Sequence, residues 1–271
     1  MTLDFTLTQY MELLSALDGY SIVTVEEFLR GRGAEPFAVL RHDVDLFPER
    51  AARMARLERG VNIRATYYFR WTGAMPREAT PQVKDNSNTV FKSSGFPVKE
   101  IIEVKLHRHE VGYHYENLSM IGDREMALRD FEAKLTELRK LAPVSTVAMH
   151  GSPLSRVCNA DLLRGIDLSG YGLLGDPHIS PEFNDVVYIT DTGRRWSSGE
   201  TSVRDRLGRP VSEKIKNTQH LISILRDMRY PNLMINAHPQ RWSATRREWT
   251  AELLGQRVRN VGKAVLRTRV R

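Results

Sequence analysis

The chain has 271 residues, 41% of them hydrophobic, and a formal net charge of +7. This length suits one α/β barrel domain, and no low-complexity linker or short repeat divides it. From Arg241 onward there are nine Lys and Arg residues against two Glu residues, which accounts for the whole excess of positive charge. The rest of the chain is balanced, which argues against a broad nucleic-acid-binding face. We predict one domain over residues 1–271, with a basic helical tail from about residue 244.

Two features bear on the compartment. The first residues lack a basic region followed by an apolar stretch, so no signal peptide is expected, and no apolar run reaches membrane-spanning length. The single cysteine, Cys158, has no partner for an intrachain disulfide. Together these features predict a cytoplasmic protein.

Helical and strand patterns alternate along the chain. Thr8 is expected to cap a first helix, and Thr24 and Glu27 have capping-box spacing for a second. Further helices are expected over 49–59 and 97–106, and from Asp123 onward. Buried apolar runs predict strands over 37–40, 63–69, 110–112, 145–149, 186–190 and 233–237. The polar run 71–96 is expected to be a functional lid or disordered. This alternation predicts a parallel sheet, open or closed as a barrel.

Polar residues follow the predicted strands at the same end. Asp43 and Asp45, two apart on an extended chain, point to the same side. Two carboxylates held together require a cation or a shared proton, although Asp45 as a simple helix cap is an alternative. The carboxyl ends of parallel strands are where a barrel builds its active site. The residues at such ends are Asp43, Asp45, Arg70, His114, His150, Asp191 and His238.

Three segments resemble the NodB-homology polysaccharide deacetylases, carbohydrate esterase family 4, in a divergent branch. They are Arg41-His42-Asp43-Val44-Asp45, His109-Glu110-Val111-Gly112-Tyr113-His114 and Asn236-Ala237-His238-Pro239. The similarity extends from about Phe37 to Trp242.

The resemblance implies a distorted (β/α) barrel with about seven parallel strands. It also implies a divalent metal that activates water to remove the N-acetyl or other N-acyl group of an amino sugar. By this resemblance Asp43 is the general base, Asp45 and His114 are metal ligands, and His238 is the general acid. The implied role is in cytoplasmic synthesis of surface polysaccharide such as O-antigen.

One position departs from the family pattern, which places a second metal histidine four residues after the first. Leu118 stands there and cannot bind a metal. His150 ends a different predicted strand and is favoured as the third ligand over Glu116. Zinc is the first choice of metal, with iron, cobalt or nickel as alternatives, because imidazole suits all four.

A basic segment follows the strand at 186–190. If Arg194 and Arg195 grip an anionic group, the substrate is an acidic or nucleotide-linked amino sugar, although a solvated loop is an equal alternative. Trp196 and Trp242 are candidates for stacking on a sugar face. We expect substrate contacts from Arg70, Glu116, Asp191, Arg194, Arg195, Trp196, Arg241 and Trp242.

Two other functions stay open. Leu118 leaves room for a metal-independent hydrolase on the same barrel, and a catalytically inactive protein that binds carbohydrate or a partner is the other alternative. The oligomeric state is undetermined. In the tail, Leu254, Val258, Val261 and Val265 recur at helical spacing. They predict an amphipathic helix that docks on the body or a partner subunit in preference to an anionic membrane.

Overall fold

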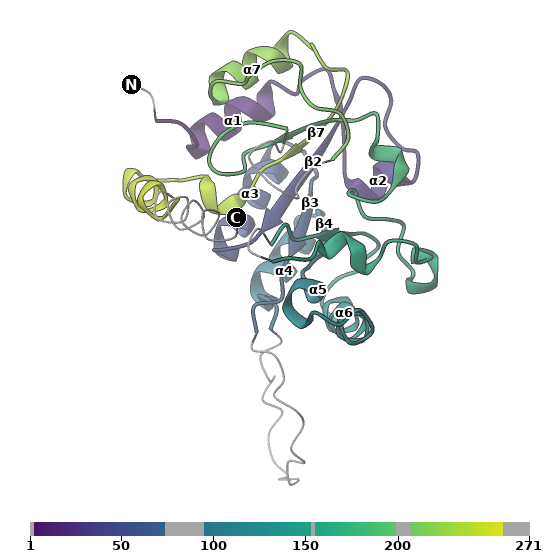
Figure 1. Cartoon of the computed structure of the whole chain (residues 1–271). Coiled ribbons are helices and arrows are strands. Elements are labelled where there is room, and N and C mark those ends of the chain that lie inside the picture. The colour runs from purple at the N-terminus through teal and green to yellow at the C-terminus, as the bar shows by residue number, and fades with distance from the viewer. Residues whose placement is uncertain (1–2, 74–94, 153–154, 199–206, 257–271) are drawn as a thin grey trace.

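The fold is built around a curved sheet of seven strands that all pair in parallel (Figure 1). The computed structural model describes residues 3–73, 95–152, 155–198 and 207–256. The strand order is β5-β4-β3-β2-β7-β6, and β1 lies beside the first half of β2. The strands are β1 Ser21–Val23, β2 Phe37–Val44, β3 Thr66–Phe69, β4 Glu110–Tyr115, β5 Val147–Met149, β6 Val187–Thr190 and β7 Asn232–Asn236. The sheet curls into a half-barrel, which confirms the distorted (β/α) barrel.

The side between β5 and β6 is not closed by regular strands. In the described part of the chain these two strands do not pair with each other. Single bridges extend each edge instead, Thr146 with Gly175 beside β5 and Val187 with Arg209 beside β6. The opening leaves the strand ends of β2, β3, β4 and β7 together in the middle of the sheet.

Helices surround the sheet, with α1 and α7 along one end of it and α4, α5 and α6 along the other (Figure 1). The α-helices are α1 Leu7–Ser15, α2 Val25–Leu29, α3 Pro48–Gly60, α4 Val98–Leu106, α5 Asn117–Ile121, α6 Arg124–Arg139 and α7 Thr218–Arg226. Short 3-10 helices cover Asn159–Leu162, Leu168–Tyr171, Pro181–Phe183 and Pro239–Arg241. Residues 246–256 are also helical.

The helix starts follow local capping chemistry. The capping box of Thr24 and Glu27 is present at α2, and the Asp123 side chain accepts a hydrogen bond from the Met126 backbone N–H at α6. The predicted cap at Thr8 is wrong, because Thr6 caps α1 by accepting from the Gln9 backbone N–H. Strand β1 and helices α5 and α7 were not predicted. The lid expected within 71–96 lies mostly outside the described residues.

Two apolar clusters hold the barrel together. The larger lies between the sheet and the helices, and the smaller fills the barrel interior with Val39, Tyr68, Ala148, Tyr188 and Met234 among others. Residues on one strand alternate between the two clusters, as the period of two requires. The interior core lies beneath the polar strand ends and supports them.

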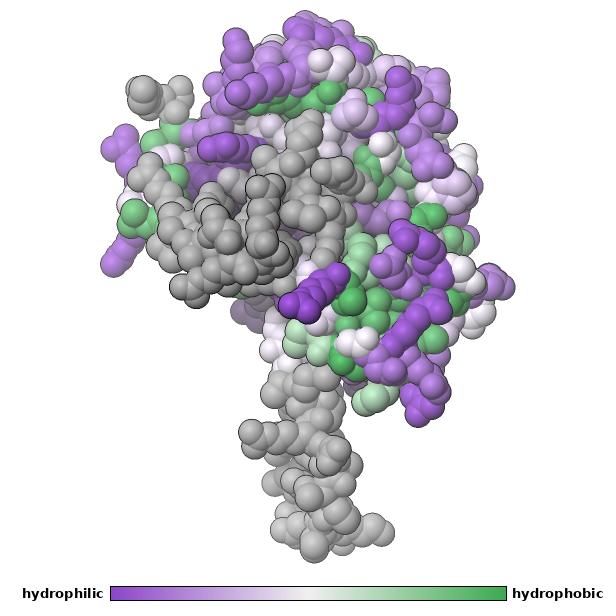
Figure 2. Space-filling view, viewed as in Figure 1, coloured by the Kyte–Doolittle hydropathy of each residue, from purple (hydrophilic) through white to green (hydrophobic). Residues whose placement is uncertain are grey.

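The surface gives no indication of a membrane span. None of the described helices is both long and apolar enough to cross a bilayer. Figure 2 shows hydrophilic side chains over the region of α1 and α7, and a group of apolar side chains over the region of α5 and α6. Met120 and Met126, the exposed large apolar residues of α5 and α6, are 57% and 60% exposed.

The start of the predicted tail packs on the body. Glu248 pairs with Arg53 at 3.1 Å, and the Trp249 indole N–H donates to the Asp4 carbonyl at 2.6 Å. The predicted apolar face is wrong at its first position, because Leu254 is 55% exposed. Val258, Val261 and Val265 lie outside the described residues.

Candidate active site

The side chains at the end of β2 alternate in direction. Arg41 and Asp43 point into the barrel, and Asp45 continues on the same side just after the strand ends. His42 points the other way, and its Nε2 lies 2.7 Å from the Glu58 carboxylate under α3. The motif therefore divides into two parts, one lining the site and one supporting it from behind.

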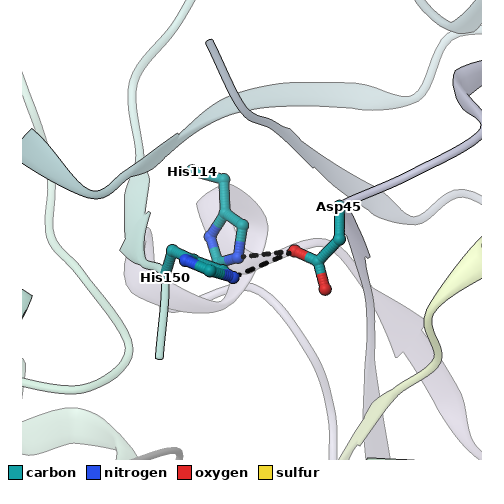
Figure 3. A group of neighbouring side chains, drawn as sticks. All are labelled: Asp45, His114 and His150. Atoms are coloured by element: carbon teal, nitrogen blue, oxygen red, sulfur yellow. Dashed lines mark ion pairs between the residues drawn. The ribbon is translucent and has the colours of Figure 1, made fainter. Parts of the chain in front are cut away.

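Asp45, His114 and His150 form the centre of the site (Figure 3). Nε2 of His114 lies 3.5 Å and Nε2 of His150 lies 3.6 Å from the same oxygen of Asp45, Oδ1. In a tetrahedral site with bonds of about 2.1 Å, two ligand atoms are about 3.4 Å apart. The three side chains come from the ends of β2, β4 and β5, so the sheet brings together residues far apart in sequence.

The donor set fits a divalent cation. Asp45 Oδ1 is buried and has no hydrogen-bond partner in the described structure. Burial raises the pKa of Asp45, but the neighbouring His114, His150 and His238 lower it well below its usual range, so the side chain is a carboxylate at neutral pH. His114 directs Nδ1 at the Ala148 carbonyl, 2.9 Å away, and a carbonyl accepts only from N–H. This contact places a ring proton on Nδ1 and directs Nε2, the other ring nitrogen, at Asp45, which is the arrangement of a metal-binding histidine.

Asp43 lies beside this cluster and is held from behind. Arg41 donates to both its oxygens, at 2.8 and 2.9 Å, and Asn236 donates to Oδ2 at 2.9 Å. Burial raises the pKa of Asp43, but Arg41, His114 and His238 together lower it well below its usual range. Oδ2 is 3.9 Å from Nε2 of His114. Asp43 is therefore a fixed anion at the edge of the candidate metal site.

His238 faces the cluster from the end of β7. Its Nδ1 lies 2.6 Å from Oδ1 of Asp191, and its Nε2 lies 3.9 Å from Oδ2 of Asp45. Asp191 also accepts from Trp242 at 3.1 Å and from Arg241 at 2.5 Å. Burial raises the pKa of Asp191, but the opposite effect of Arg241 and His238 is larger, so the pKa lies below its usual value. Asp191 fixes the orientation of the imidazole and stabilises its protonated form.

Four of the residues with predicted substrate contacts are buried in the described structure. Asp191 has no exposed surface and its bonds all go to protein groups, while Arg241 is 7% exposed and pairs with it. Trp196 and Trp242, 4% and 1% exposed, pack in the core with Phe5 and cannot stack on a sugar. From the sequence, a tryptophan after a strand end is equally compatible with a core position and with a sugar-stacking position. The tertiary packing distinguishes the two.

The other predicted contacts lie nearer the surface. Arg70 and Glu116 form an ion pair with each other, and both side chains are partly exposed. Arg194 lies against the rings of Phe5 and Trp249, so its guanidinium faces are covered. Arg195 is exposed, and it is the predicted anion-binding residue that the structure leaves accessible.

Sequence reasoning missed Arg41 and Asn236 as site residues. Both have a signal in the sequence, because each lies two residues from a predicted catalytic residue on an extended strand, and such pairs share a face. Leu118, at the position where the family has its second histidine, is 6% exposed and belongs to the core.

No family model matches the sequence, and no curated protein matches it. Among solved structures, the chain is similar to a CE4 family pseudoenzyme from Bacillus anthracis, with 12% identity, a TM-score of 0.40, and coverage of 82% of this chain and 60% of that one. A mutant of that pseudoenzyme with restored enzymatic activity matches with 12% identity and a TM-score of 0.42, over 82% of this chain and 63% of that one.

A CE4 esterase from Streptococcus mutans matches with 12% identity and a TM-score of 0.41, over 81% of this chain and 93% of that one. The chain spans about 60% of the length of the Bacillus protein. The matched proteins belong to the family that the sequence motifs resemble. At this identity and with TM-scores below 0.5, the matches carry no information on the activity of this chain.

Proposed function

We propose that the protein is a divalent-metal-dependent amidohydrolase that removes the N-acyl group of an amino sugar. The observation that carries the proposal is the convergence of Asp45, His114 and His150 on one unpartnered carboxylate oxygen, with Asp43 and His238 beside it. Three protein ligands with a free position are the usual arrangement of a catalytic zinc site. Zinc is therefore the first choice, with iron, cobalt or nickel as alternatives.

A bound divalent cation supplies two effects in such a site: it polarises the amide carbonyl and makes a water molecule acidic, with a pKa near ~7. Asp43, fixed by Arg41, would orient the attacking water and accept its proton, which is released to solvent before the next turnover while His238 takes up a proton again. A carboxylate of low pKa is a weak base, and it would suffice for a water whose pKa a bound cation lowers. His238, protonated and paired with Asp191, gives a proton to the departing amine.

The test is acetate release from N-acetylated amino sugars by the purified protein, together with its metal content by elemental analysis. We expect about one equivalent of metal, and loss of activity with retained metal in Asp43→Asn and His238→Asn. The alternative of a catalytically inactive sugar-binding protein makes two different predictions. The wild type would release no acetate, and Asp43→Asn would bind the sugar with unchanged affinity. Active wild-type protein without metal would point to the metal-independent hydrolase.

An anionic amino sugar, nucleotide-linked or otherwise acidic, is the substrate class that we propose. Exposed Arg195 supports it, since Arg is the preferred group for phosphate and carboxylate. Arg195→Ala should raise KM at least tenfold for a charged substrate, because one charge-assisted contact is worth about 1.5–3 kcal/mol. It should leave KM for a neutral analogue unchanged, and an equal rise for both would exclude the contact. Location in the cytoplasm and a role in polysaccharide synthesis stay predictions.

A further inference from the structure

Three side chains at adjacent strand ends form a chain of contacts behind the candidate metal site. Arg70 follows β3, Glu116 follows β4 and His150 follows β5. Arg70 donates to Oε1 of Glu116 from Nε at 3.1 Å and also from Nη2. The other oxygen of Glu116, Oε2, lies 3.0 Å from Nδ1 of His150. The neighbouring strands thus connect an arginine, a carboxylate and an imidazole in order.

The carboxylate fixes the form of the imidazole. Nδ1 of His150 also lies 3.1 Å from Ser152 Oγ, and this hydroxyl donates to Oε2 of Glu116 at 3.5 Å. A carboxylate accepts hydrogen bonds, so Glu116 favours a proton on Nδ1 of His150 and leaves Nε2 as the nitrogen that a metal can take. That Nε2 is the atom 3.6 Å from Oδ1 of Asp45 (Figure 3). His114 reaches the same state through the Ala148 backbone carbonyl, which no substitution can remove. His150 depends on a side chain.

Glu116 is committed to this task by its own partners. Arg70 contacts one oxygen, and the imidazole of His150 and the hydroxyl of Ser152 contact the other. The side chains of Arg70, Glu116 and His150 are 22%, 16% and 19% exposed, so water competes weakly for these contacts.

We infer that Glu116, held by Arg70, is a positioning residue that fixes His150 as the third metal ligand. The inference rests on the proposed metal site and extends it, because it explains how a histidine from β5 replaces the one missing at Leu118. A second histidine at position 118 would follow His114 on the same loop, and the local turn would set its geometry. A ligand from the next strand needs a separate partner, and the ion pair across β3 and β4 provides one.

The test measures binding of Zn²⁺ and Co²⁺ alone, so that no substrate is needed. Loss of a partner behind a metal-binding histidine weakens metal affinity by about 10- to 100-fold. We expect Glu116→Leu to show that loss in competition with a chelator, and to change the visible absorption of the Co²⁺-loaded protein. Glu116→Gln keeps an acceptor for Nδ1 and should retain most of the affinity. Arg70→Ala should weaken binding less than Glu116→Leu and add nothing to it in the double variant.

Asp130→Asn is the matched control. Asp130 is a carboxylate of similar exposure, 18%, paired with Lys134 on α6. Its loss should affect thermal stability and leave metal affinity and the Co²⁺ spectrum unchanged. If wild type binds metal and Glu116→Leu and Glu116→Gln bind it equally well with the wild-type spectrum, the inference is wrong while the metal site stands. If wild type binds neither ion, the proposed function fails and the inference with it.

Discussion

Asp191 contacts both the backbone N–H and Nδ1 of His238 and so fixes the orientation of its ring. It has no exposed surface, and its carboxylate forms hydrogen bonds with His238, Arg241 and Trp242. We predict that Asp191→Asn lowers kcat for acetate release by about 10²- to 10⁴-fold, the range of general acid catalysis, with little change in KM. The variant should also lose about 3–5 kcal/mol of unfolding free energy, because Arg241 is left as a buried, unpaired charge.

Trp242→Phe is the control for Asp191→Asn. It removes one hydrogen bond from the same carboxylate and keeps most of the ring that packs against Tyr10 and Phe5. Steady-state rates should stay close to wild type in this variant, while denaturant unfolding records a modest loss. An equal fall of kcat in both variants would mean that packing, and not the Asp191 charge, sets the rate.

At the residue scale, side-chain direction was predictable and packing was not. Alternation on a strand places Asp43 with Asp45, and it could also have placed Arg41 and Asn236. The missing histidine at Leu118 pointed to His150, which the structure brings to Asp45. No local pattern distinguishes a core tryptophan from a sugar platform, since both follow strand ends. That distinction needs the tertiary contacts of Trp196.

Strand β4 requires a glycine at position 112. A Cβ added there would lie 2.3 Å from the ring of Tyr68, and the Tyr68 hydroxyl is itself 2.9 Å from Thr146 Oγ1, so the ring has little freedom to move. We predict that Gly112→Ala costs about 1–3 kcal/mol in denaturant unfolding, as overpacking does. Because His114 shares the face of Gly112, metal affinity should fall as well.

Gly60→Ala serves as the comparison for Gly112→Ala. Gly60 ends α3, and a Cβ there meets nothing within 4 Å. Alanine should leave stability unchanged or raise it by up to about 1 kcal/mol, through its better helix propensity. If Gly112→Ala matched Gly60→Ala in stability and in metal affinity, the close approach of β4 to Tyr68 would not restrict this strand.

Elements differ in how far their sequence determines them. The strands were predictable because buried apolar runs end in polar residues, and α6 because Asp123 caps an amphipathic face. Helix α5 begins just after β4 and has five residues, which are too few to show a helical period in the sequence. Strand β1 has three residues and exists only through its pairing with β2.

A fully buried cluster connects four elements behind the site. Glu58 on α3 accepts from Tyr10 on α1 and from Tyr67 on β3 at 2.7 Å, and it pairs with His42 on β2. Nδ1 of His42 lies 2.8 Å from the Ala237 carbonyl, next to His238. Both ring nitrogens of His42 therefore face acceptors, which matches a protonated imidazole. This cluster joins the outside of the barrel to the strand end that carries His238.

The charge of His42 predicts how stability depends on pH. Burial lowers the pKa of His42, but the opposite effect of Glu58 and the Ala237 carbonyl is larger. The folded value therefore lies above the unfolded value of about 6.5. Its contribution is then fully present below pH ~6.5 and is lost as pH rises through the folded pKa. The unfolding free energy should fall over this range in denaturant titrations. In His42→Gln/Glu58→Gln the fall should disappear, and its persistence would assign the pH dependence to another group.

The helix over 246–256 packs a polar and aromatic face on the body. Glu252 and Gln256 are 4% and 6% exposed, whereas Leu254 is 55% exposed. The Trp249 ring lies 4.8 Å from the Arg194 guanidinium, beyond the strand end that carries Asp191. The sequence predicted a helix here, and of its predicted apolar positions Leu254 alone lies among the described residues, where it is exposed. The docking contacts of the described turns are ionic and aromatic.

We predict that Trp249→Ala lowers the melting temperature, through loss of the bond to the Asp4 carbonyl and of the contact with Arg194. The loss should be below the about 3–5 kcal/mol typical of a fully buried tryptophan, because Trp249 is partly exposed. In a double-mutant cycle, Arg194→Ala and Trp249→Ala should couple by about 0.5–1 kcal/mol, the strength of an exposed cation–π pair. Deleting residues 244–271 should lower the melting temperature at least as much as Trp249→Ala. An unchanged melting temperature, with binding to anionic liposomes lost on deletion, would contradict docking on the body and assign the tail to a membrane surface.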